Sequence, residues 1–231
     1  MAIFKVQTIS LVGLVGQLIT VEVDIGDGLP NFTLLGLPDA ALNESRDRVR
    51  SAIVNSNLKW VNRRTTVSLS PAWLPKSGSG FDLAIAVALL GASGNLNSAN
   101  LDSTILIGEL GLDGEIKSTR GILPALISAK KLEIKRAIIP KANIQECKLL
   151  TDIEVVPVAN LNAVIDYLMT GVFEAIEFVD DSKSNICPDM SEVLGQSSAR
   201  KLIEISAMGG HNVLLIGPPG TGKTMLAQRL P

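Results

Sequence analysis

The residues whose types and spacing could do chemistry stand near the C-terminal end of the chain, in the run GPPGTGKT. Its glycines allow successive backbone amides to turn into one concavity that binds phosphate. Lys223 can reach the β and γ phosphates of a nucleotide, and the Thr224 hydroxyl can bind Mg²⁺. The helix expected from about residue 223 directs its positive end at the same anion. The predicted nucleotide-binding residues are Gly217, Pro218, Pro219, Gly220, Thr221, Gly222, Lys223, Thr224 and Met225.

The elements around this run are those that a phosphate loop requires. An apolar strand is expected at 213–216, directly before the glycines, and the run KTMLAQRL after them suits a helix. A further helix is expected from about Ser197 to Gly209-Gly210, which would end it. Its inner face is expected to carry Ala199, Leu202, Ile203 and Ser206. The order strand, loop, helix argues against the alternative of a plain glycine-rich turn.

Composition favours a layered α/β protein. The 231 residues are 46% apolar and only 19% charged, which excludes a disordered chain. Aromatic residues make up only 3%, so the core must rest on Val, Ile, Leu and Ala. The net charge of −2 gives no global positive field, and any contact with nucleic acid would need a local basic patch.

The chain carries no sequence signal for a membrane or for secretion. It has no run of about eighteen apolar residues and no cleavage pattern after its N-terminus, so no membrane span is expected and the cytoplasm is the predicted compartment. Cys147 and Cys187 lack metal-binding spacing and are expected to be reduced thiols. A disulfide or a metal role is the alternative for them.

Residues 1–170 are expected to form a first, mixed α/β domain, followed by a linker at 171–190 and a second domain from 191 to 231. The expected strands are 2–8, 17–25, 31–37, 64–70, 104–108, 137–139 and 155–156. The expected helices are 39–57, the run FDLAIAVALLGASG at 81–94, 121–131 and 161–169. Asp39 should cap the first helix, and GLDG at 111–114 should form a turn.

Several segments together resemble one protein family. EVLGQSSARKLIEISAMGGHNVLLIGPPGTGKTMLAQRLP resembles the start of the ATPase module in the YifB/ComM family of magnesium-chelatase-like AAA+ proteins. VEVDIGDGLPNFTLLGLPDAALNESRDRVRSAI and GSGFDLAIAVALL are similar to that family's first domain. The resemblance covers essentially the whole chain and implies the N-terminal part of a longer protein.

The resemblance implies a first domain with the fold of the Lon protease's proteolytic domain, related to the second domain of ribosomal protein S5. Lon uses a serine and a lysine. The run PKSGSG at 75–80 resembles Lon's serine loop, but the nucleophile position holds Gly80 and the lysine position falls near Leu123. A fold retained without peptidase chemistry is therefore expected. The alternative is a substitute pair from Ser77 or Ser79 with Lys76, but Lys76 in an exposed-looking loop should remain charged.

The resemblance also implies ATP and Mg²⁺ as cofactors, a homo-hexameric ring and an adenine contact from residues 193–196, Gln196 among them. The carboxylate, sensor and arginine finger that hydrolysis needs would lie beyond Pro231, so we assign no catalytic residue here and expect ATP hydrolysis of the longer protein. A phosphate loop with one strand before it lacks neighbouring strands, so residues 191–231 are expected to be marginally folded.

Two further features leave alternatives open. His211, the one histidine, could sense the γ phosphate or bind a metal, but a packing role is favoured because no second histidine accompanies it. A basic cluster could form a nucleic-acid face, although Arg46 lies on the side of Leu42 and Arg48 can pair with Glu44. The cluster comprises Arg46, Arg48, Arg50, Lys59, Arg63 and Arg64.

Three functions compete. The first is an ATP-driven motor on DNA, because ComM-like relatives are implicated in branch migration during natural transformation. The second is an ATP-dependent protease or protein remodeller, which the Lon-like domain suggests. The third is a metal-insertion ATPase of the magnesium-chelatase type, for which no residue here suggests a tetrapyrrole site. We favour the DNA motor, although the fold alone cannot establish that substrate.

Overall fold

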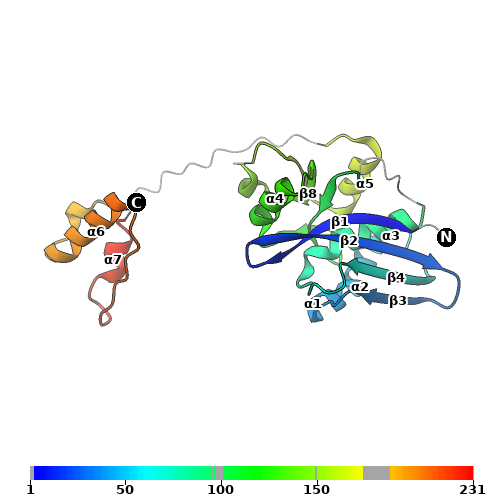
Figure 1. The fold of residues 1–231 in the computed structure, drawn as a ribbon, viewed down its shortest axis with the longest axis horizontal. Helices are drawn as coiled ribbons and strands as arrows, with labels where there is room; N and C mark the ends of the chain where they lie inside the picture. The colour runs from blue at the N-terminus through cyan, green and yellow to red at the C-terminus, as the bar shows by residue number, and fades with distance from the viewer. Residues whose placement is uncertain (1–2, 95, 97–100, 149, 174–187, 231) are drawn as a thin grey trace. The chain divides into compact units, whose positions relative to one another are not determined.

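A computed structural model of the chain describes residues 3–94, 96, 101–148, 150–173 and 188–230. The chain divides into two compact units, Met1–Phe178 and Val179–Pro231 (Figure 1). Unit 1 contains the large mixed sheet, and unit 2 contains the GPPGTGKT run.

Unit 1 is built on a mixed sheet whose described strands follow the order β3-β4-β2-β1-β5-β8-β9. β1 and β2 form a long hairpin, β4 is antiparallel to β2, and β3 is parallel to β4. β5, β8 and β9 extend the other side of β1 in parallel. The strands are β1 Phe4–Val12, β2 Val15–Gly26, β3 Asn31–Leu35, β4 Arg64–Ser70, β5 Thr104–Leu106, β8 Arg136–Pro140 and β9 Glu154–Val158. The predicted α/β class is confirmed.

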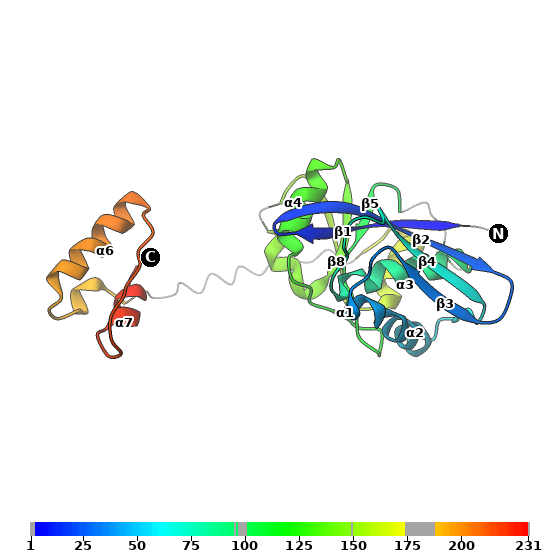
Figure 2. The same cartoon turned by 60° about the horizontal axis from the view of Figure 1, so that its bottom comes forward.

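Helices cover both faces of this sheet. Buried side chains of α2, α3 and α5 pack into one apolar cluster, and those of α4 pack into another with Ile105 and Ile139. Figure 2 shows α2 and α3 together on one side of the β1–β2 strands and α4 on the other. The helices are α1 Ala40–Asn43, α2 Ser45–Asn55, α3 Asp82–Ala92, α4 Ile122–Lys131 and α5 Leu161–Thr170. A short hairpin of β6 Glu109–Leu110 and β7 Ile116–Lys117 carries the predicted turn at 111–114.

Most predicted elements of unit 1 are confirmed, and one is corrected. The strand at 64–70 has the predicted bounds, and α3 is buried from Asp82 to Gly91, as its alanine-rich sequence indicated. The helix predicted at 39–57 is wrong as a single element, because the chain breaks at Glu44 into α1 and α2. The Asp47 amide bonds back only three residues to the Glu44 carbonyl at 3.1 Å, which tightens the turn there.

Unit 2 has a small core. Val193, Ile203 and Leu226 are buried, and they join η3 Met190–Glu192, α6 Ser197–Gly209 and α7 Lys223–Ala227. Gly210 ends α6 in a left-handed conformation at φ 62, as predicted. The chain's linker and domain boundaries stay predictions.

Two expectations for unit 2 are wrong. The predicted strand at 213–216 is absent from the described residues, and Leu214 and Ile216 are 82% and 87% exposed, because no strand lies beside this segment to pair with it. Leu202, predicted to face inward, is 52% exposed, whereas Ile203 and Ser206 of the same predicted face are buried. A small core covers only a narrow stripe of a helix.

A buried ion pair joins α2 to the start of α3. Arg48 donates to both carboxylate oxygens of Asp82, at 2.7 and 3.1 Å, and the Asp82 side chain is fully buried. Burial raises the pKa of Asp82 to about 6, while the hydrogen bonds from Arg48 lower it. The carboxylate in turn raises the pKa of Arg48.

Replacing Arg48 with methionine is expected to destabilise the protein by about 3 kcal/mol at pH 8, because the Asp82 carboxylate is then buried without a cation. Loss of the guanidinium also moves the Asp82 pKa above its present value of about 6. The loss of stability should therefore shrink as the pH falls from 8 to 5, since a protonated Asp82 needs no cation. Urea unfolding followed by circular dichroism at both pH values checks this.

Lys130→Met is the matched control, because Lys130 pairs with Asp152 on the surface, where the two side chains are 52% and 58% exposed. Its effect should stay below about 1 kcal/mol at either pH. A loss from Arg48→Met that is the same at pH 5 and pH 8 would contradict the assigned role of Asp82.

Candidate functional site

Glycine geometry shapes the GPPGTGKT loop between residue 216 and α7. Gly220 and Gly222 have φ values of 82 and 77, which side-chain-bearing residues rarely adopt. A Cβ built on Gly220 would meet nothing within 4 Å, whereas one on Gly222 would lie 3.0 Å from the Gln196 Nε2. The loop backbone is therefore open at Gly220 and closely packed at Gly222.

Lys223 folds back onto the loop. Its Nζ donates to the carbonyl oxygens of Gly217 and Pro218, at 2.7 and 2.6 Å, and lies 3.3 Å from the Thr221 Oγ1. The Thr221 hydroxyl also donates to the Pro218 carbonyl, at 3.0 Å. One ammonium, two threonine hydroxyls and an open glycine backbone are the donors that a polyphosphate requires, so the residues present fit ATP.

The structure brings Gln196 to the same loop. Its Nε2 donates to the Thr221 carbonyl at 3.1 Å, although the two residues lie 25 positions apart. Met225 is partly buried against the unit 2 core, whereas Thr224 is exposed in the first turn of α7. Pro218 and Pro219 are exposed. The nucleotide-binding roles of all these residues stay predictions.

A metal site made by the protein alone is not seen. In the parts of the chain that the structure describes, no three His, Cys, Asp or Glu side chains gather around a point that could hold a metal ion. Mg²⁺ would therefore depend on Thr224 and on the phosphates of a bound nucleotide. The amide of His211 donates to the Ser206 carbonyl at 2.9 Å and its ring lies beside Gly209, but the residue is exposed, so its role stays a prediction.

Cys147 is a free, buried thiol, and burial raises its pKa to about 11, so it is poorly suited to redox or metal chemistry. Cys187 lies outside the described residues.

A second candidate site is a cavity of about 390 Å³ in unit 1. It lies where the resemblance places the serine loop of Lon, and its walls include Ser77, Ser79 and Gly80. The Ser79 hydroxyl donates to the Glu109 carboxylate across the cavity wall. Sequence reasoning singled out the serines but missed Glu109, because 30 residues separate it from Ser79.

The expectation for Lys76 is corrected. Lys76 is completely buried, although its loop looked exposed, and burial lowers its pKa. Its ammonium donates to the Pro71 carbonyl, while its backbone bonds to Leu37 and Asp39. Lys76 therefore closes its own loop and does not line the cavity beside the serines.

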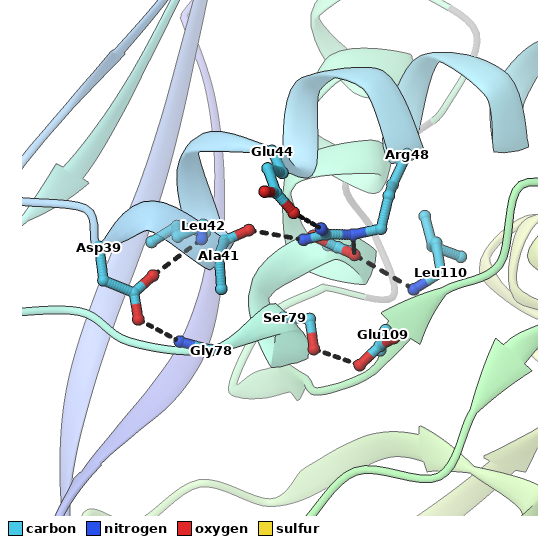
Figure 3. A network of polar contacts seen from close by, with 10 residues as sticks. Asp39, Ala41, Leu42, Glu44, Arg48, Gly78, Ser79, Glu109 and Leu110 are labelled. Atoms are coloured by element: carbon cyan, nitrogen blue, oxygen red, sulfur yellow. Dashed lines mark hydrogen bonds and ion pairs between the residues drawn. The ribbon is translucent and has the colours of Figure 1, made fainter.

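A polar network holds the serine loop in place (Figure 3). Asp39 caps α1 by accepting from the Leu42 amide at 2.8 Å, and its other oxygen accepts from the Gly78 amide at 3.0 Å. Arg48 donates to the Ala41 carbonyl at 2.9 Å as well as to Asp82. Three separate segments of the chain thereby fix the position of Gly78 and Ser79.

Several arginines of the predicted basic cluster have contacts within the protein. Arg46 lies 6.0 Å from the ring centroid of Phe32, Arg48 pairs with Asp82 and, at 3.6 Å, with Glu44, and Arg63 pairs with Asp27. The pairing of Arg48 with Glu44 is confirmed. These contacts favour an internally paired surface over a nucleic-acid face.

No helix among the described residues is long and apolar enough to cross a membrane.

Comparison with known proteins gives matches to both units. The family profile described as subunit ChlI of Mg-chelatase matches residues 21–143, and the profile of magnesium chelatase, subunit ChlI, matches residues 189–231. An uncharacterized protein of Mycobacterium tuberculosis is 43% identical over 233 residues, which cover 100% of this chain and 46% of that protein. The chain thus spans about half the length of this relative.

Two named relatives show similar coverage. The competence protein ComM of Haemophilus influenzae is 40% identical over 94% of this chain and 44% of its own length. YifB of Escherichia coli, an uncharacterized protein, is 41% identical over 100% of this chain and 46% of its own length.

Lon proteases match only parts of the chain. Lon protease 2 of Bacillus subtilis is 29% identical over 101 residues, which cover 43% of this chain and 18% of that protein. Together with the mixed sheet, this partial match supports the Lon-like fold. Since the ChlI profile alone matches more than half of the residues, and the similarity to ComM and YifB extends over both units, the chain belongs to the YifB/ComM family of magnesium-chelatase-like proteins.

Proposed function

We propose that this chain binds Mg²⁺-ATP at the 217–224 loop and forms the nucleotide-binding start of a cytoplasmic AAA+ motor that remodels DNA as a homo-hexameric ring. The observation that carries ATP binding is the loop itself, in which Lys223, Thr221 and an open Gly220 converge. Bound ATP supplies the energy of phosphate transfer, and the residues here hold and orient it.

Each loop residue has a separate part in this proposal. Lys223 exchanges its two carbonyl contacts for charge-assisted bonds to phosphate oxygens, which are stronger. Thr224 offers an exposed hydroxyl to Mg²⁺. Gln196 fixes the Thr221 carbonyl and so keeps the left-handed backbone at Gly222 in place. Hydrolysis requires further groups, which we expect from the longer protein.

DNA is the proposed substrate because the Haemophilus influenzae relative carries the name competence protein. A polypeptide is the second candidate, and the partial similarity to Lon proteases favours it. A metal-insertion activity ranks last, because it would need a tetrapyrrole-binding partner and none of the described residues suggests a tetrapyrrole site.

Lys223→Ala is expected to weaken ATP binding roughly 10- to 100-fold, because hydrogen bonds to charged groups contribute about 1.5–3 kcal/mol each. Titration with a fluorescent ATP analogue in the presence of Mg²⁺ measures this. Lys201→Ala is the matched control, since Lys201 is an exposed lysine of α6 outside the loop. Equal affinities for the wild type and Lys223→Ala would contradict the assignment of the loop.

ATP turnover by the full-length protein is expected to rise several-fold with single-stranded, duplex or branched DNA, and Lys223→Ala should abolish that turnover. Phosphate release with and without each DNA form measures it. Turnover that is indifferent to every DNA form, but rises with an unfolded polypeptide, would overturn the DNA substrate and leave the ATPase assignment intact.

A further inference from the structure

One edge of β1 is open beside the unit 1 cavity. β2 pairs with β1 along its whole length, from Phe4↔Val23 to Val12↔Val15. On the other side β5 pairs at Gln7↔Ile105 and ends at Leu106. Within the described ranges, no strand pairs with the Ile9–Val12 part of β1 on that side.

This open edge faces the cavity. Ile9, Ser10 and Leu11 all line it. Successive side chains of a strand point to opposite faces of the sheet, so three consecutive residues line one cavity only when the strand presents its backbone edge to it. The unpaired amides and carbonyls of a strand edge are a template for another extended chain.

One polar group in the cavity lacks a partner. Ser10 is only 4% exposed, and its hydroxyl makes no hydrogen bond with any described residue. The hydroxyl is not cut off from solvent, so a ligand in the cavity can reach it and bond to it.

The facing walls suit the approach of a main chain. They include Gly78, Gly80 and Gly121, and a Cβ built on Gly78 would meet nothing within 4 Å. Gly78 also has a φ of 89, and its amide is held by Asp39 at 3.0 Å. A Cβ built on Gly80 would lie 3.1 Å from the Thr119 side chain and one on Gly121 2.5 Å from the Leu11 side chain, so the space for the backbone of a ligand is at Gly78.

The charges in the cavity select the class of ligand. Glu109 is half-buried in one wall and bonds to Ser79, while Arg120 is exposed and has no partner among the described residues. The described lining holds one carboxylate and one guanidinium, so it offers no net positive charge to attract a polyanion such as nucleic acid. A peptide fits both signs, because its backbone is neutral and alternates donors with acceptors.

The cavity is poorly equipped to cleave a peptide. None of its described lining residues is lysine or histidine, the side chains that activate a serine in known dyads and triads. Gly80 stands where Lon has its nucleophile, and Lys76 is buried in bonds to its own loop.

We propose that unit 1 holds a non-cleaving peptide site, in which an extended polypeptide segment adds to the free Ile9–Val12 edge of β1 between the 77–81 and 118–121 loops. Main-chain hydrogen bonds give such a strand addition its affinity. Ser10, Arg120 and Glu109 provide polar contacts for its side chains or chain end.

The test uses fluorescein-labelled, reduced and carboxymethylated lactalbumin as an unfolded polypeptide, with anisotropy as the measure of binding to the full-length protein. Arg120→Glu and Ser118→Trp, which change two exposed residues of the cavity rim, should each weaken binding at least fivefold. Lys131→Glu, which reverses an exposed charge of α4 outside the cavity, should change it less than twofold. Hydrogen exchange should slow in residues 9–12 when lactalbumin is bound.

No binding at any accessible concentration, or equal binding by Arg120→Glu and Ser118→Trp, would overturn the proposal. Protection confined to residues away from 9–12 would overturn the strand addition. Displacement of lactalbumin by a single-stranded DNA of 20 nucleotides, with the same sensitivity to Arg120→Glu, would assign the site to nucleic acid instead. Cleavage of lactalbumin that Ser79→Ala abolishes would overturn the non-cleaving assignment.

Discussion

The Asp82 carboxylate is the constraint on which the geometry of unit 1 depends. It begins α3, the most buried of the described helices, in which all residues from Asp82 to Gly91 are shielded from water. A carboxylate there is costly unless its oxygens are bonded, and they are bonded by Arg48 of α2 and, at 3.3 Å, by the Leu110 amide of β6. One group therefore fixes α2, α3 and β6 relative to each other. Ser79 lies three residues before Asp82, and Glu109 lies directly before Leu110. The Asp82 carboxylate therefore also fixes the cavity wall that Ser79 and Glu109 form.

A second set of buried bonds fixes the loop before α3. The Asp39 carboxylate accepts hydrogen bonds from the Leu42 amide of α1 and from the Gly78 amide. The Lys76 ammonium donates to the Pro71 carbonyl. A lysine that is needed as a structural donor inside its own loop is not available as a base for a neighbouring serine. The same contacts that make the serine loop rigid thus remove it from peptidase chemistry. They leave a preformed cavity with open space at Gly78, which suits binding without reaction.

Local sequence patterns predicted most helices and strands of unit 1. Contacts between residues far apart in the sequence determine the burial and the side-chain pairing around the cavity, and these could not be predicted. The two-residue period of β4 and the alanine-rich sequence of α3 are local, and both were predicted closely. Asp39 was correctly predicted to cap a helix, but its bond to Gly78, 39 positions away, has no sequence signal. The burial of Lys76 and the pairing of Ser79 with Glu109 depend on tertiary packing in the same way. The strand at 213–216 was predicted from its apolar residues, yet a strand forms only where a neighbour accepts its hydrogen bonds.

The loop of unit 2 illustrates how a site can be ordered by its own bonds. Lys223 satisfies the Gly217 and Pro218 carbonyls, and Gln196 satisfies that of Thr221. These neutral acceptors hold the ammonium less strongly than phosphate oxygens do, so the proposed nucleotide would replace them with stronger bonds. Leu214 and Ile216 before the loop are exposed, and covering them would contribute about 1.5–3 kcal/mol each. Under the proposed function, binding of nucleotide and burial of residues 214–216 would stabilise the same loop, so each would favour the other.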